Sequence, residues 1–221
     1  MRMNKVVVWV ATLALFLLPN LTGWSAQDMF IVIDDEASVK SLIPNLTNGN
    51  GTVALEKKDV YQEDDDRKAS LFVDAVGGDF QKFNPSIPDW QISIKKNPGK
   101  SEFRYLTWAW KKTGGAGIQL QLSVSGDWGH RYHAGVNAQN WNPSLEVDPK
   151  MPKEWTLVTR DVATDWGEIV ITGMAFSNSG PTSSVWDHLV FHQTKDDPLA
   201  PQAVDPQEKL PVTWGKLKLG D

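Results

Sequence analysis

The chain has 221 residues, of which 41% are hydrophobic and 22% charged, a composition that argues against disorder over the whole length. Its formal net charge of -5 and the lack of any Lys/Arg run longer than two residues argue against a nucleic-acid partner. The absence of cysteine excludes disulfides, thiolate metal sites, cysteine nucleophiles and covalent c-type haem attachment. Tryptophan is the outlier, with 11 residues, and suits either a dense core or an exposed stacking surface.

Residues 1–26 have the pattern of an export signal. Arg2 and Lys5 precede an uncharged run at 6–18, which is shorter than the ~20 residues needed to span a bilayer. We therefore predict a secreted protein that is periplasmic, extracellular or held at the cell surface. Cleavage after Gly23 or Ala26 and retention as an uncleaved anchor both stay open. No later segment is apolar enough to span a membrane.

Residues 27–194 are predicted to form one domain built from short β-strands. Its first part is expected to contain a strand, a helical turn, an Asn/Gly-rich loop and two further short strands, at 29–33, 37–43, 45–52, 53–55 and 60–61. An acidic run follows at 63–66. It lacks the alternating ligands and central glycine of an EF-hand loop, so we interpret it as a solvated turn rather than a calcium loop.

From residue 69 onward, apolar and polar residues alternate in short segments. The predicted strands are 69–75, 89–94, 103–112, 118–124, 131–137, 155–161, 169–176 and 184–194. The pair 103–112 and 118–124 flanks a Gly-rich turn and is predicted to form a hairpin. Eight to ten short strands with almost no helical period predict an all-β fold, an antiparallel two-sheet β-sandwich.

Four tryptophans lie in predicted strands and are expected in the core: Trp90, Trp108, Trp110 and Trp155. Trp128 and Trp141 lie in turns, where burial and exposure are both open. In the last strand, Asp187 shares the parity of Val185 and Leu189, so it is predicted to point toward the core. A buried carboxylate needs partners, and we expect backbone N–H groups, Arg104 or Arg160 to supply them.

The residues give no support for catalysis. His188 and His192 would lie ~13 Å apart along a strand, too far to share one metal ion. No G-x-S-x-G elbow, phosphate loop or dinucleotide fingerprint is present. The carboxylates of Asp161, Asp165 and Glu168 are candidates for glycoside hydrolysis, but we interpret the two aspartates as turn residues. The chain is therefore predicted not to be an enzyme.

A polar strand and the loop after it combine the residue types that bind sugars, which are aromatic rings for stacking and polar side chains for hydroxyl groups. The exposed row Gln119/Gln121 is expected to border this site. The candidate ligand-binding residues are Trp128, His130, Arg131, Tyr132, His133, Asn137 and Trp141.

The motif FRYLTWAWKKTGGAGIQLQL, followed by RYHAG, EWTLVTRDV, ITGMAF and VWDHLVF, resembles a module of large secreted bacterial surface proteins that often accompanies cytochrome c domains. The module is similar to galactose-binding-like and carbohydrate-binding-module sandwiches. The resemblance covers roughly residues 50–194 and implies a jelly-roll fold and an ancillary, non-catalytic role. It implies no cofactor beyond a structural calcium ion, for which the sequence shows no ligand set. The chain departs from this context because it has no cytochrome motif.

Residues 195–221 form a Pro-rich tail that ends in a polar segment around Trp214. Trp214 is expected to dock either on the protein's own sandwich or on a protein partner. The leading hypothesis is a secreted, non-catalytic module that recognises carbohydrate or another cell-surface component. The alternatives are a surface protein–protein interaction module and a glycan-active enzyme.

Overall fold

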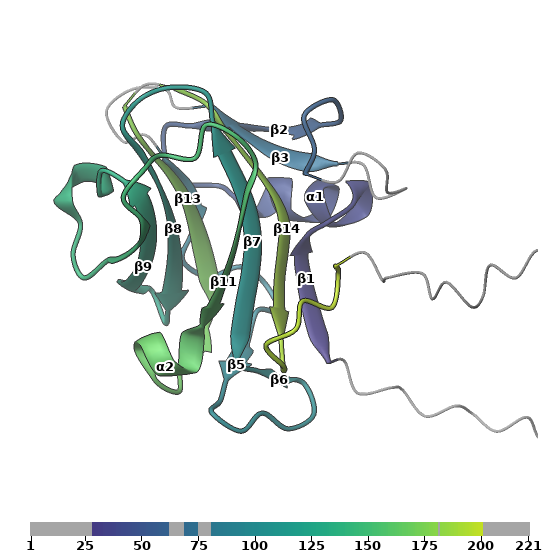
Figure 1. Cartoon of the computed structure of the whole chain (residues 1–221). Coiled ribbons are helices and arrows are strands. Elements are labelled where there is room, and N and C mark those ends of the chain that lie inside the picture. The colour runs from purple at the N-terminus through teal and green to yellow at the C-terminus, as the bar shows by residue number, and fades with distance from the viewer. Residues whose placement is uncertain (1–27, 62–68, 75–80, 181, 201–221) are drawn as a thin grey trace, which may run out of the picture.

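The computed structural model describes residues 28–61, 69–74, 81–180 and 182–200 (Figure 1). Two large sheets pack face to face, and a small third sheet lies at one end of the sandwich. The predicted all-β, two-sheet sandwich is thus confirmed. The expected signal segment 1–26, the acidic run 63–66 and the tail around Trp214 lie outside the described residues.

The first large sheet, sheet A, has the strand order β11-β7-β14-β3-β2, and β1 pairs with β14 as well. All of its pairs are antiparallel. Its strands are β1 (Met29–Ile33), β2 (Thr52–Glu56), β3 (Ser70–Asp74), β7 (Tyr105–Lys112), β11 (Thr156–Asp161) and β14 (Ser184–His192).

The second large sheet, sheet B, has the order β10-β9-β8-β13-β4. The pair of β9 and β10 is parallel, whereas the other pairs are antiparallel. Its strands are β4 (Gln81–Asn84), β8 (Gly117–Val124), β9 (Asp127–Gly135), β10 (Leu145–Asp148) and β13 (Gly173–Ser179).

The remaining elements lie outside the two large sheets. The small sheet contains β5 (Ile92–Ile94), β6 (Glu102–Phe103) and β12 (Val170–Ile171), and the helices are α1 (Glu36–Leu42), the 3₁₀ turns Ile43–Asn45 and Ala138–Asn140, and α2 (Val162–Trp166). Helix α1 starts with a capping box, in which Asp35 accepts from the backbone N–H of Ser38 and Ser38 accepts from that of Asp35. This predicted helical turn is confirmed.

Aromatic side chains fill the space between the two large sheets. Trp108 and Trp110 are fully buried and meet edge to face at 5.3 Å between ring centroids. Trp186 contacts Trp110 at 5.4 Å and Phe176 of sheet B at 5.0 Å. Fully burying one large apolar side chain contributes about 1.5–3 kcal/mol, so this cluster is a main source of stability.

The other two predicted core tryptophans differ from this pair. Trp90 is partly buried against the core. Trp155 precedes β11 and contacts Tyr61 and Lys111, while its Nε1 donates to Asp59 at 2.9 Å. The prediction that Trp155 lies in the core was therefore wrong, because its indole N–H donates to an acceptor outside the sandwich interior.

The predicted hairpin of 103–112 with 118–124 is also wrong. β7 pairs with β11 and β14, and β8 pairs with β9 and β13, so the two strands lie in different sheets. The segment 113–116 crosses between the sheets, and buried Lys112 donates to the carbonyl of Thr182 beside this crossing. Gly117 passes so close to Val136 that a Cβ would lie 2.0 Å from its carbonyl oxygen. β7 and β8 each have an apolar face. These faces pack against each other across the core, and the two strands do not form backbone hydrogen bonds with each other.

A bulge in β14 changes which face its side chains occupy. Asp187 lies opposite Ala109 and Val190 opposite Thr107, so β14 has one extra residue between these pairs. Asp187 consequently shares the outer face of sheet A with Val185, whereas Leu189 is in the core. Asp187 is buried as predicted, and the direction predicted for it was wrong.

The segments that cover the outer face of sheet A explain this burial. Asp187 accepts the backbone N–H groups of Tyr61 and His188, at 2.9 and 2.7 Å. No strand forms at the predicted position 60–61. The segment after β14 also packs here, since Asp197 contacts the His188 ring at 2.7 Å and Leu199 is buried. Residues 197–199 therefore pack against sheet A.

Candidate functional site

The outer face of sheet B, opposite the core, carries polar side chains in register. One cross-strand row contains Phe83, Ala175, Gln121 and Arg131, from β4, β13, β8 and β9. The next row contains Gln81, Ser177, Gln119, His133 and Glu146, the last from β10. Successive residues of a strand point to opposite faces, so these rows form a polar floor behind the apolar core.

A hydrogen-bond network fixes the centre of this floor. The Nε2 group of Gln121 donates to Gln81 at 2.9 Å and to Ser177 at 2.7 Å. The Oε1 atom of Gln121 accepts from Nε of Arg131 at 2.8 Å. Gln121 is buried and uses both ends of its amide, so it holds the Arg131 guanidinium in one orientation.

Two half-buried tryptophans stand at this floor. Trp128, at the start of β9, meets Phe83 edge to face at 5.6 Å between ring centroids. Trp141 belongs to the loop between β9 and β10. A hollow of about 220 Å³ is lined by six residues, which we call the groove: Gln81, Phe83, Gln121, Trp128, Arg131 and Trp141.

The loop that carries Trp141 is tied to sheet B by polar contacts. Asn137 accepts from Gln119 at 2.8 Å and donates to the carbonyl of Trp141 at 2.9 Å. Gln119 also donates to Ser144, and Arg131 donates to the carbonyl of Pro143 at 3.3 Å. Asn137 is therefore a positioning residue for Trp141.

His133 lies on the same face, two residues beyond Arg131. Its Nδ1 is 2.8 Å from the hydroxyl of Ser144, and its Nε2 is 3.9 Å from Glu146. Partial burial lowers the pKa of His133 below its ordinary value, and the Glu146 carboxylate opposes this effect. Burial therefore favours the neutral form of His133.

The structure brings together five of the seven predicted ligand-binding residues and separates two. Trp128, Arg131 and Trp141 line the groove, and Asn137 and His133 border it. His130 and Tyr132 alternate with Arg131 along β9 and so belong to its other face, where His130 meets Trp166. Tyr132 is fully buried and contacts Trp108 at 5.4 Å, which removes it from the candidate ligand-binding set.

Other details of the floor differ from the sequence analysis. Gln119 and Gln121 were expected to form an exposed row, but both are buried because the loop after β9 and the β4 strand cover them. Gln81 and Phe83 of the groove were not predicted at all. They alternate with Lys82 and Asn84 over only four residues, a period-two signal too short to identify a strand.

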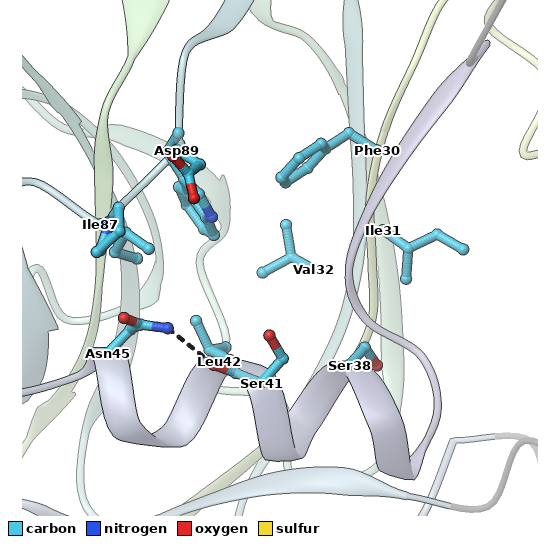
Figure 2. A pocket seen from close by; sticks show the side chains of 11 residues that line it. Phe30, Ile31, Val32, Ser38, Ser41, Leu42, Asn45, Ile87 and Asp89 are labelled. Carbon is cyan, nitrogen blue, oxygen red and sulfur yellow. Dashed lines mark hydrogen bonds between the residues drawn. The ribbon is translucent and has the colours of Figure 1, made fainter. Parts of the chain in front are cut away.

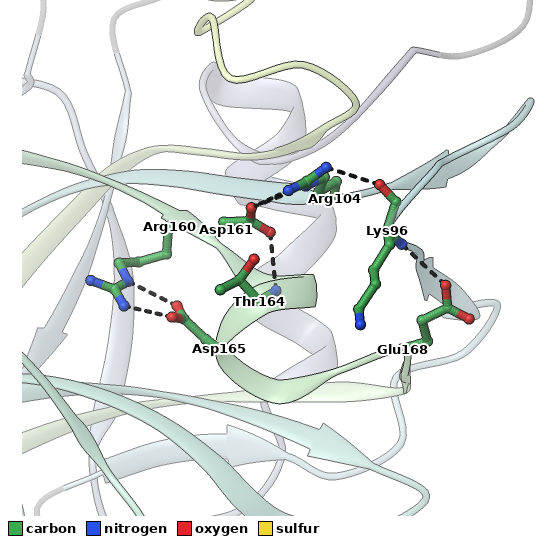
Figure 3. Close-up of polar contacts among 7 residues, drawn as sticks. All are labelled: Lys96, Arg104, Arg160, Asp161, Thr164, Asp165 and Glu168. Carbon is green, nitrogen blue, oxygen red and sulfur yellow. Dashed lines mark hydrogen bonds and ion pairs between the residues drawn. The ribbon is translucent and has the colours of Figure 1, made fainter.

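The carboxylates considered for glycoside hydrolysis are held in ion pairs near helix α2 (Figure 3). Asp161 accepts from Arg104 at 2.7 Å and caps Thr164 at the start of α2. Asp165 receives two bonds from Arg160, at 2.6 and 2.8 Å, and a third from the hydroxyl of Tyr132 at 3.0 Å.

Glu168, the third of these carboxylates, is exposed and lies 3.3 Å from Nζ of Lys95. It also accepts the backbone N–H of Lys96 (Figure 3). These contacts account for all three carboxylates as structural groups, and the arginines expected as partners of Asp187 are used here instead.

A second hollow, of about 270 Å³, lies between α1, β1 and the segment 87–90 (Figure 2). Phe30, Val32 and Leu42 give it apolar walls. Two of its polar groups are already used, since Asn45 donates to the carbonyl of Ser41 and Ser38 caps α1. This hollow contains none of the predicted ligand-binding residues.

The described residues contain no group of three or more histidine, aspartate or glutamate side chains placed to hold a metal ion. Among the same residues, no helix has the length and apolar character needed to cross a membrane. The structural calcium ion stays a prediction from the sequence.

No family model matches the chain, and no curated protein does. Among solved structures, the chain is similar to a family 29 carbohydrate-binding module, with 13% identity, coverage of 82% of this chain and 97% of that chain, and a TM-score of 0.45. It is also similar to a family 30 carbohydrate-binding module, with 11% identity, coverage of 74% and 85%, and a TM-score of 0.41. A third neighbour is the family 11 module from Clostridium thermocellum in complex with a β-1,3-1,4-mixed-linked tetrasaccharide, with 10% identity, coverage of 66% and 86%, and a TM-score of 0.39.

Proposed function

We propose that the protein is an exported, non-catalytic module that binds carbohydrate in the groove on the outer face of sheet B. One observation carries the proposal: two half-buried tryptophans stand at a floor whose polar groups are fixed by hydrogen bonds. A sugar ring has apolar C–H faces and a polar rim, so it fits a site with aromatic walls and a polar base.

The size of the groove suits a polysaccharide that lies along the surface of sheet B and is not enclosed by it. Its volume of about 220 Å³ is below the ~300–1,000 Å³ of pockets that enclose drug-sized ligands. The residues also support a binding role rather than hydrolysis, because Asp161 and Asp165 are engaged by arginines away from the groove. Export rests on the signal pattern of residues 1–26.

Glycan binding by the full chain and three Trp→Ala variants tests the proposal. We expect Trp128→Ala and Trp141→Ala each to weaken binding at least about tenfold, as for a central aromatic contact residue. Trp155→Ala is the matched control, since Trp155 is also half-buried but contacts Tyr61 and Asp59 on the outer face of sheet A. Isothermal titration against a panel of neutral and acidic polysaccharides measures the affinities.

The two groove variants and the control distinguish glycan binding in the groove from binding elsewhere or no binding. Loss of binding in both groove variants, with the control unchanged, supports the proposal. Binding that is insensitive to both groove variants, or no binding to any polysaccharide, contradicts it.

A further inference from the structure

The three arginines of the described residues fall into two groups. Arg104 and Arg160 each contact a carboxylate, Asp161 and Asp165, at 2.7 and 2.6 Å (Figure 3). Arg131 has no carboxylate within the 4.0 Å of an ion pair among the described residues. It is the one arginine of this part of the chain whose charge is not compensated by a direct contact.

The guanidinium of Arg131 has N–H groups left for a ligand. A guanidinium carries five N–H donors in a planar fork. Arg131 uses Nε toward Gln121 and one Nη1 donor toward the carbonyl of Pro143. Both donors of Nη2 and the second donor of Nη1 have no acceptor among the described residues, and Arg131 lines the groove.

Partial burial makes this uncompensated charge costly. Burial lowers the pKa of Arg131 from its ordinary value, and the more distant Asp127 carboxylate only partly opposes this effect. A cation removed from water without a partner destabilises the fold, so such a group is usually paired or bound. The fixed orientation imposed by Gln121 adds a reason to expect a ligand, because a pre-oriented fork loses little entropy on binding.

We propose that the glycan bound in the groove carries a carboxylate, as in a uronic acid, and that Nη1 and Nη2 of Arg131 bind it. This inference rests on the proposed function, since it names the ligand class of the same groove. A planar carboxylate matches the planar fork of arginine and accepts two parallel hydrogen bonds, a match that a tetrahedral sulfate makes less well. The net charge of -5 repels polyanions in general, so the selectivity comes from this local contact.

Matched pairs of polymers test the inference with the full chain. The probes are polygalacturonate, alginate and glucuronoxylan, each with its carboxyl-reduced counterpart, and one sulfated galactan. We expect at least one acidic polymer to bind about 10- to 100-fold more tightly than its reduced counterpart, as for a hydrogen bond to a charged group. Added salt should diminish this preference, because it screens the charges.

Variants of Arg131 assign the preference to this side chain. Arg131→Gln should abolish the preference, so that the acidic and the reduced member of each pair bind with equal affinity. Arg131→Lys keeps the charge without the fork and should retain only part of the preference. Thermal unfolding checks that each variant is folded.

The outcomes separate this inference from the proposed function. If acidic and reduced polymers bind equally and Trp141→Ala loses both, the proposed carboxylate contact is overturned but the proposed sugar binding in the groove is supported. A preference that survives Arg131→Gln, a full preference in Arg131→Lys, or binding of the sulfated polymer alone also overturns it. No binding to any polymer overturns both proposals.

Discussion

The α2 region and the groove both contain arginine and tryptophan side chains, but they differ in whether the arginine is paired with a carboxylate. Near α2, Arg160 pairs with Asp165, Tyr132 donates to the same carboxylate, and Trp166 packs on Tyr132. In the groove, Arg131 has no carboxylate partner among the described residues, and Trp128 and Trp141 are half-buried. Near α2 the Asp165 carboxylate compensates the charge of its arginine, whereas the groove leaves guanidinium donors and aromatic surface for another molecule.

The difference shows why residue type alone does not identify a binding site. An arginine, an aspartate and a tryptophan close together are as typical of a structural ion pair as of a ligand site. What distinguishes the groove is an arginine that contacts no carboxylate among the described residues.

The largest effect is expected for Asp165→Ala. The substitution leaves Arg160 and the Tyr132 hydroxyl without their acceptor at a carboxylate site that is only 10% exposed. We expect the free energy of unfolding to fall by about 3 kcal/mol, measured by urea denaturation. Glycan affinity of the folded protein should not change. A loss of affinity without a loss of stability would place Asp165 in the binding site and contradict the comparison.

A pair of arginine substitutions gives the next largest difference. Arg160→Gln leaves the half-buried Asp165 carboxylate without its cation, and should lower the free energy of unfolding by about 2 kcal/mol. Arg131→Gln removes an uncompensated charge and keeps a donor for Gln121, so its effect should stay within about 0.5 kcal/mol. The same denaturation experiment measures both. Equal destabilisation by the two variants would show that the regions do not differ as described.

A smaller effect is expected for Tyr132→Phe, which removes one hydroxyl group and keeps the ring in the core. The hydrogen bond from Tyr132 to Asp165 should account for about 1 kcal/mol of unfolding free energy. Because Tyr132 is fully buried, its loss should not alter glycan binding. Thermal unfolding and titration on the same sample measure the two quantities. Weaker binding at unchanged stability would return Tyr132 to the ligand-binding set.

The smallest effects depend on pH and involve one histidine from each region. Burial lowers the pKa of both His130 and His133 below the ordinary value of 6.5. As pH falls below 6.5, the unfolded chain therefore binds protons before the folded chain does, and the free energy of unfolding decreases. Asp187 acts in the opposite direction, since burial raises its pKa from 3.8 to about 7. We therefore measure the free energy of unfolding as pH falls below 6.5. The informative quantity is the difference between the parent protein and His130→Gln or His133→Gln.

Glycan binding should respond to only one of these histidines. Protonation of His133 adds a positive charge beside the groove, so the affinity for a uronic acid polymer should rise between pH 7 and about pH 5. His130→Gln should keep this rise, because His130 lies on the other face of β9. His133→Gln should remove it. An unchanged pH profile in His133→Gln would contradict the proposed electrostatic role of His133 in the groove.

The sequence by itself determined the class of fold and identified part of the candidate site. Period-two alternation identified most strands and the apolar faces of Trp108 and Trp110, because a buried face requires every second residue to be apolar. The unusual tryptophans Trp128 and Trp141 also stood out, since both lie outside the apolar alternation of the strands. These signals are local, because each can be recognised from a few consecutive residues.

Only the tertiary structure decided which strands pair and which polar groups remain unsatisfied. Alternation predicts the same apolar face whether β7 and β8 form a hairpin or cross between sheets, so the crossing was invisible in the sequence. The extra residue in β14 reversed the face assigned to Asp187 in the same way. The pairing of β7 with β11 brings Asp161 beside Arg104, 57 residues away in the sequence. The pairing of β8 with β9 places Gln121 beside Arg131, and no carboxylate of the described residues.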